Sequence, residues 1–401
     1  MRENLKRQLA LVLALVMLLS LTACGGNSGN NAAQNQTEGQ ENSAQQESDE
    51  AADGQLVSEG MVELQYAQRF SIEKFQGGYR MITAGNEGTG GHKQYLVVPE
   101  GKSVPEDLAE DVIVLQLPIE NVYCASSSMI SLSNAIGALD KIKLCATDYD
   151  SWELEAVKKQ MDEGKLTYSG SYKEPDYELM TANNIDLHLD TAMLDGYPEV
   201  LEKFAELGIP SLVEDSSLEE HPMGRIEWVK VLGTLFDLED EADAYFADQV
   251  ERFNAACVDE SLGKSVALGY ITSSGKCYAR NGGDYIAQLI EMAGGDYVCA
   301  DMEPEETGNT SMTFEEWYDK FVNADYLFYY NLGQKFYSVQ EMIDYNPLFA
   351  DFKAVQNGNV WVTCDGFSQK SADIVGVITD MNTVLTSEDN TVTTDFIVKL
   401  S

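Results

Sequence analysis

Residues 186–213, DLHLDTAMLDGYPEVLEKFAELGIPSLV, place a strand, a helix and a second strand in direct succession. Residues 186–189 alternate polar and apolar side chains, which predicts a short strand. Residues 197–207 carry apolar side chains three and four apart, the spacing of one helical face. Gly208 ends this helix, and residues 209–213 begin a new strand. This order is typical of a βαβ unit, whose two strands lie parallel in one sheet.

The same alternation of strand and helix extends on both sides of this unit. The further expected elements are strands at 122–125, 266–271, 326–330 and 360–362 and helices at 128–139 and 284–293. They separate into an earlier and a later group. We therefore expect an α/β protein with two lobes, each built on a mainly parallel sheet.

Residues 224–256 lie between the two groups, and their apolar side chains recur mostly three and four apart without a proline. A continuous helix over these residues has a length of roughly 50 Å at 1.5 Å per residue. We expect this single helix, residues 223–257, to join the lobes. Gly233 and Asp237 are weak points, so two packed helices with a turn near Asp237 are the alternative.

A small β-rich extension is expected before the first lobe, over residues 57–117. Its strand candidates are residues 66–72, 95–99 and 112–117. The expected boundaries are therefore residues 57–222 for the N-terminal lobe with its extension, and residues 258–401 for the C-terminal lobe.

The first 24 residues have the pattern of a bacterial export signal. A basic start precedes an apolar run over residues 9–21, which is shorter than the ~20 residues needed to span a bilayer. The ending Leu-Thr-Ala-Cys resembles a lipobox, which implies cleavage of residues 1–23 and attachment of acyl chains, such as palmitate, to Cys24. An ordinary signal peptide with a chance cysteine and an uncleaved anchor are the alternatives. Residues 24–56 are polar and predict a disordered tether.

The composition argues against several classes of partner. The formal net charge is −41, whereas nucleic-acid binding requires clustered lysine and arginine. The same charge argues against a body that lies flat on an anionic membrane. Six cysteines besides Cys24 have no C-x-x-C spacing, which argues against a zinc site and leaves one or two disulfides or free thiols as alternatives.

Several segments together resemble one known family. They are residues 174–178 (EPDYE) with 184–186 (NID), 220–228 (EHPMGRIEW), 285–297, and 313–317 (TFEEW) with 324–325 (AD). These segments resemble the solute-binding lipoproteins of ABC importers, in the helical-linker class that binds iron–siderophores, haem and cobalamins. Two departures are the ~60 residues before Pro118 and the lack of a proline in residues 184–186.

The resemblance implies a protein that binds a solute outside the cytoplasm and delivers it to an ABC permease and its ATPases. It implies no catalytic activity, no cofactor and a monomer anchored to the membrane by lipid. An iron–siderophore-type chelate is the expected ligand, with haem or a cobamide as the alternative. Carboxylates on the two lobes would pair with permease arginines. By the resemblance, Glu178 in the first lobe and Glu315 in the second would have this docking role, with Glu316 as the alternative to Glu315. The other explanation is that these carboxylates are ordinary solvated surface groups.

Candidate ligand-binding residues follow the strands of each lobe, where open α/β sheets bind ligands. Ser126 and Ser127, with Ser128, follow the strand at 122–125, although a helix N-cap is the alternative role. Tyr278 and Arg280 follow the strand at 266–271; a surface ion pair is the alternative for Arg280. Weaker candidates are Phe367, Ser368, Gln369 and Trp361, and a core position is the alternative for Trp361.

Other functions have weaker support in the sequence. A bare metal site needs clustered histidines, but His92, His188 and His221 lie far apart in the chain. The sequence contains no G-x-S-x-G, H-E-x-x-H or P-loop motif. A hydrolase that uses only carboxylates stays open as an alternative, because paired acids give no motif. A surface protein that binds no small ligand is a second alternative.

Overall fold

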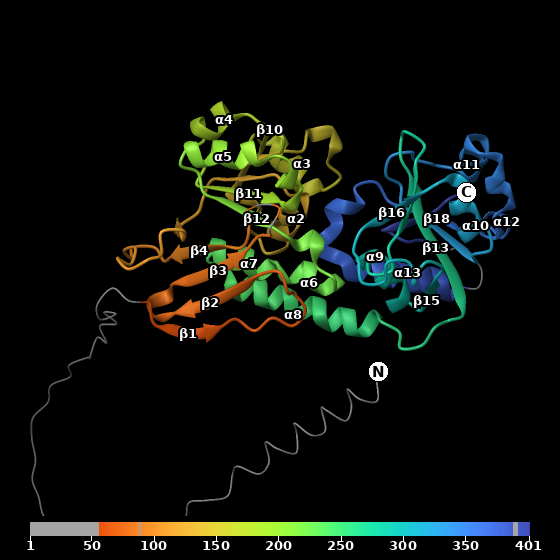
Figure 1. Ribbon diagram of the computed structural model, residues 1–401, viewed down its shortest axis with the longest axis horizontal. Helices are drawn as coiled ribbons and strands as arrows, with labels where there is room; N and C mark the ends of the chain where they lie inside the picture. Colours follow the sequence, from red (N-terminus) through yellow and green to blue (C-terminus); the bar gives the residue numbers. More distant parts are fainter. Residues whose placement is uncertain (1–55, 87, 89, 388–391) are drawn as a thin grey trace, which may run out of the picture. The chain divides into compact units, whose positions relative to one another are not determined.

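The structure is a computed structural model that describes residues 56–86, 88, 90–387 and 392–401. Cys24, the signal sequence and residues 24–55 of the expected tether lie outside the described residues. Three large sheets, one after another along the chain, organise the described part (Figure 1). No helix of this described part is long and apolar enough to cross a membrane.

The first lobe is built on a five-stranded sheet in which every pairing is parallel. Its strands, in sheet order, are β12 (Ser211–Glu214), β11 (Leu187–Thr191), β6 (Val122–Cys124), β7 (Ile142–Cys145) and β8 (Thr167–Tyr168). Alternate residues of these strands face opposite layers, as the pleat requires. Its helices are α2 (Ser127–Ala135), α3 (Glu155–Asp162), α4 (Tyr177–Ala182) and α5 (Pro198–Glu206). The expected βαβ unit is thus β11, α5 and β12.

The two faces of this sheet have separate cores. Tyr123 and Val213 pack with Phe204 of α5 on one face. On the other face, Val122 and Leu212 belong to a core that continues through α2, the linker helices and the second lobe. The sheet is therefore buried on both faces, as expected for parallel strands.

The second lobe contains a seven-stranded sheet with a parallel centre and antiparallel edges. Its strands are β16 (Asn309–Met312), β14 (Cys277–Arg280), β13 (Lys264–Ile271), β17 (Tyr326–Tyr329), β18 (Val360–Thr363) and β19 (Ile397–Lys399) in sheet order, with β15 (Gly295–Tyr297) paired to β13. Only the β13–β15, β13–β17 and β17–β18 pairings are parallel. This sheet is mixed, because β14, β16 and β19 pair antiparallel with their neighbours. Its helices are α9 (Tyr285–Met292), α10 (Phe314–Phe321), α11 (Val339–Tyr345), α12 (Lys353–Gln356) and α13 (Ile374–Thr386).

The segment between the lobes is not one continuous helix, so that prediction is wrong. It contains α6 (Pro222–Glu227), α7 (Val229–Phe236) and α8 (Glu239–Ala256). Asp237 takes a left-handed conformation with φ of 57°, which aspartate tolerates better than most residues. A side chain at Gly233 would stand 2.7 Å from Cβ of Ala242, so glycine permits α7 to pack closely on α8. The alternative of two packed helices with a turn near Asp237 is confirmed.

The N-terminal extension forms a five-stranded sheet in the order β1 (Ser58–Met61), β2 (Ser71–Phe75), β3 (Arg80–Ala84), β4 (Lys93–Val98) and β5 (Ile113–Gln116). The strand expected over residues 66–72 begins only at Ser71. The backbone amides of residues 65–67 instead donate to the Glu227 carboxylate, and those of residues 68 and 69 donate to Glu219. We call residues 62–69 the strap, because they hold the extension to the linker helices.

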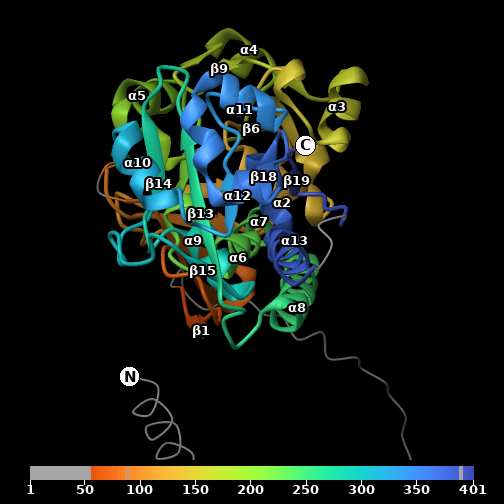
Figure 2. The ribbon, with the colours of Figure 1, turned by 90° about the vertical axis from the view of Figure 1, so that its right-hand side faces the viewer.

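The C-terminal helix α13 packs along α8, as the side view in Figure 2 also shows. At the start of this contact, Arg252 of α8 forms an ion pair with Asp373 at 3.0 Å. Tyr245 of α8 donates a hydrogen bond to the Ala372 carbonyl. The linker helices therefore contact elements of the second lobe as well as the first.

The six cysteines among the described residues are free thiols. Cys124, Cys145, Cys277 and Cys299 are buried, and Cys257 and Cys364 are half-buried. Burial raises the pKa of Cys145 to about 11, so its thiol is protonated at neutral pH. Of the two alternatives that the sequence left open, the structure has the free thiols.

Candidate functional site

A cavity of about 60 Å³ lies where residues of the two lobes meet. We call it the interlobe cavity. Its lining residues are Ser128 of α2, Arg225 of α6, Tyr285 and Leu289 of α9, Phe367, Ser368, Lys370 and Ser371 of the 3-10 segment η9 (Phe367–Asp373), and Ile374 and Val377 of α13. The lining combines apolar side chains and the Tyr285 ring with three serines and two cations, contributed by several elements. Ligand sites likewise combine an apolar lining with polar groups that orient the ligand.

Arg225 brings a positive charge to this cavity from α6. Its guanidinium lies over the ring of Tyr285, 4.0 Å from the ring centre, and one terminal nitrogen donates to the Ser217 carbonyl at 2.8 Å. The Nε atom is buried and has no hydrogen-bond partner among the described residues. A guanidinium carries five N–H donors. Arg225 therefore keeps donor capacity for a group that the cavity would receive.

Arg280, at the end of β14, is a second arginine with unused donor capacity. One terminal nitrogen lies 3.3 Å from the Asp284 carboxylate, and the side chain is only 11% exposed. The guanidinium lies 4.8 Å from the ring centre of Tyr330, and its Nε is buried without a hydrogen-bond partner in the described structure. Burial opposes the charge, but Asp284 and then the neighbouring tyrosines outweigh it and raise the pKa of Arg280.

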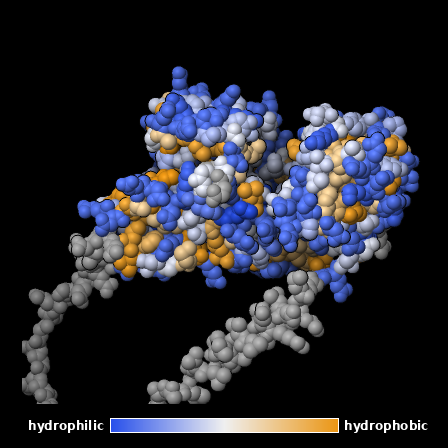
Figure 3. Space-filling view, in the orientation of Figure 1, coloured by the Kyte–Doolittle hydropathy of each residue, from blue (hydrophilic) through white to orange (hydrophobic). Residues whose placement is uncertain are grey.

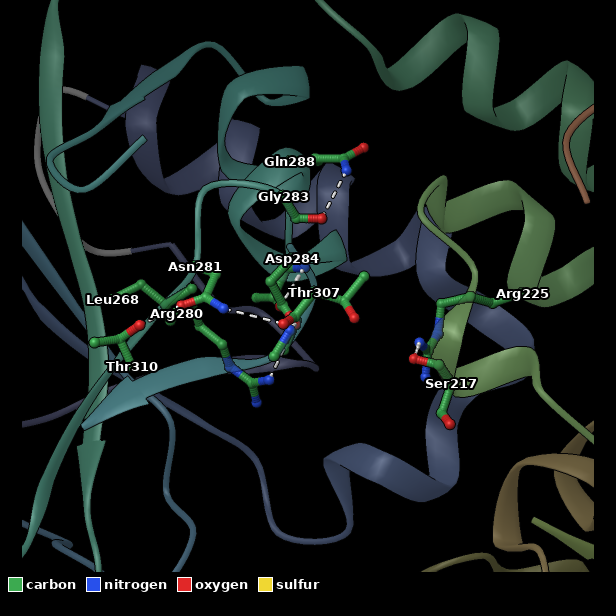
Figure 4. Close-up of polar contacts among 12 residues, drawn as sticks. Ser217, Arg225, Leu268, Arg280, Asn281, Gly283, Asp284, Gln288, Thr307 and Thr310 are labelled. Atoms are coloured by element: carbon green, nitrogen blue, oxygen red, sulfur yellow. Dashed lines mark hydrogen bonds and ion pairs between the residues drawn. The ribbon is translucent and has the colours of Figure 1, made fainter. Parts of the chain in front are cut away.

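Each arginine lies over one tyrosine ring, Arg225 over Tyr285 and Arg280 over Tyr330. Tyr285 contacts Arg225 directly and also acts electrostatically on Arg280. Burial, with a smaller contribution from Tyr285, raises the pKa of Tyr330, and the charges of both Arg280 and Arg225 oppose that rise. Tyr330 also meets Phe367 of the cavity edge-on, at 5.6 Å between ring centres. Figure 4 shows Arg280 beside Asp284 and Arg225 beside Ser217, on separate parts of the chain.

Ser126 and Ser127 lie at the start of α2, where the sequence placed them. The Ser126 hydroxyl donates to Glu214 at 2.7 Å and accepts from the Met129 amide, so Ser126 is the N-cap of α2. Burial raises the pKa of Glu214, whereas hydrogen bonds from Ser216 and Ser126 and the charge of Arg225 oppose the rise. Ser127 is half-buried, but it is the next residue, Ser128, that lines the cavity.

Tyr278 stacks on Tyr270, with 5.1 Å between ring centres and 8° between ring planes. Tyr270 in turn meets Tyr330 edge-on at 6.1 Å. Tyr278 therefore extends the aromatic group that surrounds Arg280 but does not line the interlobe cavity itself. Trp361, a weaker candidate, is fully buried in β18, which is the core position that the alternative described.

Gln369 connects the two lobes directly. Its side-chain oxygen accepts from the Glu153 amide at 2.7 Å, and its side-chain nitrogen donates to the Ser151 carbonyl at 2.7 Å. These bonds hold the η9 segment, which supplies four cavity residues, against the loop after β7. Gln369 is 7% exposed, so breaking both bonds would leave buried polar groups without partners.

Glu178 and Glu315 are both exposed, on α4 and α10 of different lobes. No hydrogen bond or ion pair involves either carboxylate within the described residues. Glu316 differs, because its carboxylate accepts from the Thr313 amide and hydroxyl at 2.8 and 2.9 Å in a capping box. The structure thus gives Glu316 a local role and leaves the Glu315 carboxylate available to a partner.

The three histidines occupy separate environments. His188 is buried between Ser211 and Asp190 at 2.9 and 3.0 Å, whereas His221 caps α6 and stacks on Tyr66. His92 is exposed. Over the described ranges, no group of three or more His, Cys, Asp or Glu side chains is placed to hold a metal ion.

Sequence reasoning missed part of this site. Arg280 was identified because it follows a strand, whereas Arg225 was read only as part of the start of the linker. Tyr330 was read only as the end of a strand. The usable signal was the scarcity of basic residues in a chain with 26 lysines and arginines against 67 acids. An arginine at a strand or helix end in such a chain is a candidate for an anion.

Comparison with known proteins places this geometry in a family. The family model described as periplasmic binding protein matches residues 122–365, more than half of the chain. An uncharacterized lipoprotein of Methanocaldococcus jannaschii is 27% identical over 311 residues, which cover 74% of this chain and 73% of that protein.

Solved structures share the fold at low sequence identity. A periplasmic haem-binding protein of Pseudomonas aeruginosa matches with a TM-score of 0.54 and 15% identity, covering 70% of this chain and 98% of that one. An ABC-type Fe³⁺-hydroxamate transport system of Saccharomonospora viridis matches with a TM-score of 0.50 and 22% identity, covering 66% and 93%. The two-lobed α/β architecture is thus that of known solute-binding proteins.

Proposed function

The chain belongs to the periplasmic binding protein family, and on that premise we propose that it is the extracytoplasmic solute-binding component of an ABC importer. The observation that carries the proposal is the interlobe cavity, to which both lobes and α6 contribute side chains. A site made by two lobes binds its ligand only when both are in place. Such an arrangement suits capture of a solute and its presentation to a permease.

The ligand that we propose is an iron–siderophore-type chelate, with haem or a cobamide as the second choice. Structures with this fold include a haem-binding protein and a component named for Fe³⁺-hydroxamate transport. The tyrosine and phenylalanine rings around Arg225 and Arg280 support a ligand with flat, conjugated groups, since aromatic side chains favour stacked contacts.

Binding such a ligand requires the cavity to enlarge. Its volume of about 60 Å³ is well below the roughly 300–1,000 Å³ of sites for drug-sized ligands. The η9 segment packs on α2 of the first lobe and is bonded to that lobe by the two hydrogen bonds of Gln369. We infer that these bonds break when the ligand binds.

A titration tests the binding role. Purified protein is titrated with ferric siderophores, haem and cobalamin, and binding is followed by intrinsic fluorescence and native mass spectrometry. We expect a complex of one ligand per chain for at least one compound. Absence of binding for the whole panel, with activity on a glycosidase substrate, would favour the hydrolase alternative instead.

The proposal also includes the anchor and the partners. Lipid on Cys24 would hold the protein outside the cytoplasm, and residues 24–56 would allow the body to reach the permease. In a host with one membrane the protein would lie on its outer face, and in a Gram-negative host it would lie in the periplasm. The acidic surface is consistent with a free body, and the face shown in Figure 3 is largely hydrophilic.

Replacing Glu178 or Glu315 with arginine is expected to abolish ligand uptake and leave ligand affinity within twofold. A reversed charge would repel the permease arginines that the carboxylate is proposed to meet. Uptake of labelled ligand into cells and titration of the purified variants measure the two effects separately. Glu316→Arg is not a suitable control because Glu316 caps α10, so the exposed Glu251 of α8 is used. Loss of affinity in Glu178→Arg or Glu315→Arg would reject the docking role.

A further inference from the structure

Ser211, His188 and Asp190 form a chain of hydrogen bonds on one face of the first lobe's sheet. Ser211 begins β12 and lies opposite His188 of β11, and Asp190 follows His188 by two residues on the same face. The Ser211 hydroxyl lies 2.9 Å from Nδ1 of His188, and Nε2 of His188 lies 3.0 Å from the Asp190 carboxylate. A hydroxyl, an imidazole and a carboxylate in this order are the arrangement that activates a serine as a nucleophile.

The surroundings of His188 fix the orientation of its ring. The imidazole is fully buried and stacks on Phe204 of α5 and on Tyr123, at 3.8 and 5.3 Å between ring centres. Asp190 is fully buried as well, and its second oxygen accepts from a backbone amide. Because a carboxylate oxygen accepts, Nε2 of His188 donates to Asp190, and Nδ1 is left to accept from the Ser211 hydroxyl. In this tautomer the imidazole can take the serine proton.

A groove of about 330 Å³ opens at Ser211. It lies between α5 and the N-terminal extension, and its lining includes Leu201 of α5, residues 113–114 of β5 and Lys93 of β4. His188 stacks under α5, so the hydroxyl bonded to it is on the α5 side of the sheet, where the groove lies. Among the described residues, the groove and the interlobe cavity share no lining residue. The volume is at the lower end of the roughly 300–1,000 Å³ of small-molecule sites.

The backbone at Ser211 supplies a donor for the negative charge that develops on an attacked carbonyl. In its sheet, β12 is the edge strand, with β11 as its neighbour. The Ser211 carbonyl accepts from the Tyr95 hydroxyl of β4 at 3.0 Å, so it points away from β11 toward the extension. The amide and carbonyl of a strand residue point to the same side, which directs the Ser211 N–H toward the extension too. Together with the positive charge of Lys93 in the groove, this donor would stabilise an oxyanion.

We propose that Ser211 is the nucleophile of an esterase site for carboxylic esters with a small apolar acyl group. Oγ of Ser211 bonds to the ester carbonyl carbon while its proton moves to Nδ1 of His188, and Asp190 positions the imidazolium. The bond from that carbon to the alcohol oxygen breaks, and the alcohol leaves with the proton. Water then attacks the acyl-serine, passes its proton through His188 to Oγ, and releases the carboxylic acid. This activity does not depend on the proposed solute binding.

Covalent labelling tests the nucleophile directly. The full chain is purified in detergent and incubated with a fluorophosphonate, from which a serine nucleophile displaces fluoride and forms a stable phosphonate ester. We expect peptide mass spectrometry to place one label per chain on Ser211. His188→Asn keeps a polar group beside Ser211 but no base, and should slow labelling by about 100-fold or more, since general-base catalysis contributes about 10²–10⁴. Ser261→Ala is the control, because the Ser261 hydroxyl donates to Asp296 at 2.6 Å without a histidine, and labelling should be unchanged.

Hydrolysis of p-nitrophenyl butyrate measures turnover by the same variants. We expect kcat/KM to fall by about 100-fold or more in Ser211→Ala and His188→Asn and to stay within about twofold of the wild type in Ser261→Ala. Thermal unfolding of each variant separates loss of activity from loss of fold. If His188→Asn does not fold, Ser211→Ala decides, because it removes only a hydroxyl.

The outcomes separate this inference from the proposed function. Absence of a label on Ser211 in the folded wild-type protein, or equal hydrolysis by the wild type and Ser211→Ala, overturns the esterase site and shows that the hydrogen-bonded chain is structural. The titration with chelates decides solute binding independently of either result.

Discussion

Replacing Glu227 with alanine is expected to lower the free energy of unfolding by about 3–5 kcal/mol, the loss typical of a broken buried ion pair. The Glu227 carboxylate is fully buried and accepts from the amides of residues 65–67 at 2.8–3.1 Å and from Lys230 at 3.0 Å. Alanine would leave these donors buried without an acceptor. Since folded proteins are stable by only about 5–15 kcal/mol, the change is a large fraction of the total.

Thermal and urea unfolding measure this loss, and hydrogen exchange locates it. The strap amides should exchange faster in Glu227→Ala than in the wild type, because the carboxylate is their acceptor. Glu227→Gln keeps one acceptor oxygen and should lose less. The exposed Glu251 of the neighbouring helix is the control, and Glu251→Gln should stay within about 0.5 kcal/mol of the wild type. Equal unfolding of Glu227→Ala and this control would show that the strap is held by other contacts.

A comparison of the strap with the βαβ unit shows which parts of the fold could be predicted from the sequence. The unit of β11, α5 and β12 was predictable because its signals are local: alternation, helical spacing and a glycine stop. The strand predicted over residues 66–72 takes in part of the strap, whose amides bond instead to a carboxylate 160–162 residues away. Apolar periodicity carries no information about a contact at that separation.

The prediction of one continuous helix over residues 223–257 was wrong for a similar reason. Its helical spacing was real, and α6, α7 and α8 together cover most of the expected helix. The α7 helix ends at Asp237, whose left-handed backbone turns the chain so that α8 packs back on Gly233, which is a tertiary contact. Gly233 and Asp237 were visible as weak points in the sequence, but periodicity alone does not decide between a bend and a reversal of direction.

In the candidate site, too, the residues with local sequence signals could be predicted and those brought in by tertiary contacts could not. Arg280 and the serines after β6 could be predicted, because ligand residues follow strands in α/β sheets. The hydrogen-bond partners of these residues could not be predicted. Ser126, for example, is the N-cap of α2 and donates to Glu214. Arg225 reaches the cavity only because α6 lies against α9, where its guanidinium covers Tyr285. That juxtaposition depends on the packing of the linker between the lobes.

Replacing Trp317 with alanine is expected to destabilise the protein by about 3–5 kcal/mol, the usual loss for a large buried aromatic side chain. Trp317 of α10 is fully buried and packs on Phe321, Phe349 and Phe352 at 4.6–5.8 Å between ring centres. Alanine would leave a cavity in this aromatic group and remove the donor that bonds the Tyr278 carbonyl at 3.2 Å.

Urea unfolding followed by circular dichroism checks the size of this effect. Trp317→Phe keeps an aromatic ring but lacks the indole N–H, so it separates the ring from the hydrogen bond, which is worth about 1 kcal/mol. Tyr337, which is 61% exposed, gives the matched control, and Tyr337→Ala should change stability by less than about 0.5 kcal/mol. A loss below 1 kcal/mol in Trp317→Ala would contradict the packing. A Cβ atom at Gly269 of β13 would stand 2.7 Å from Nε1 of Trp317, so glycine is needed there for the indole to reach the sheet. The ring therefore also helps to position α10 on the sheet that carries Tyr278 and Arg280.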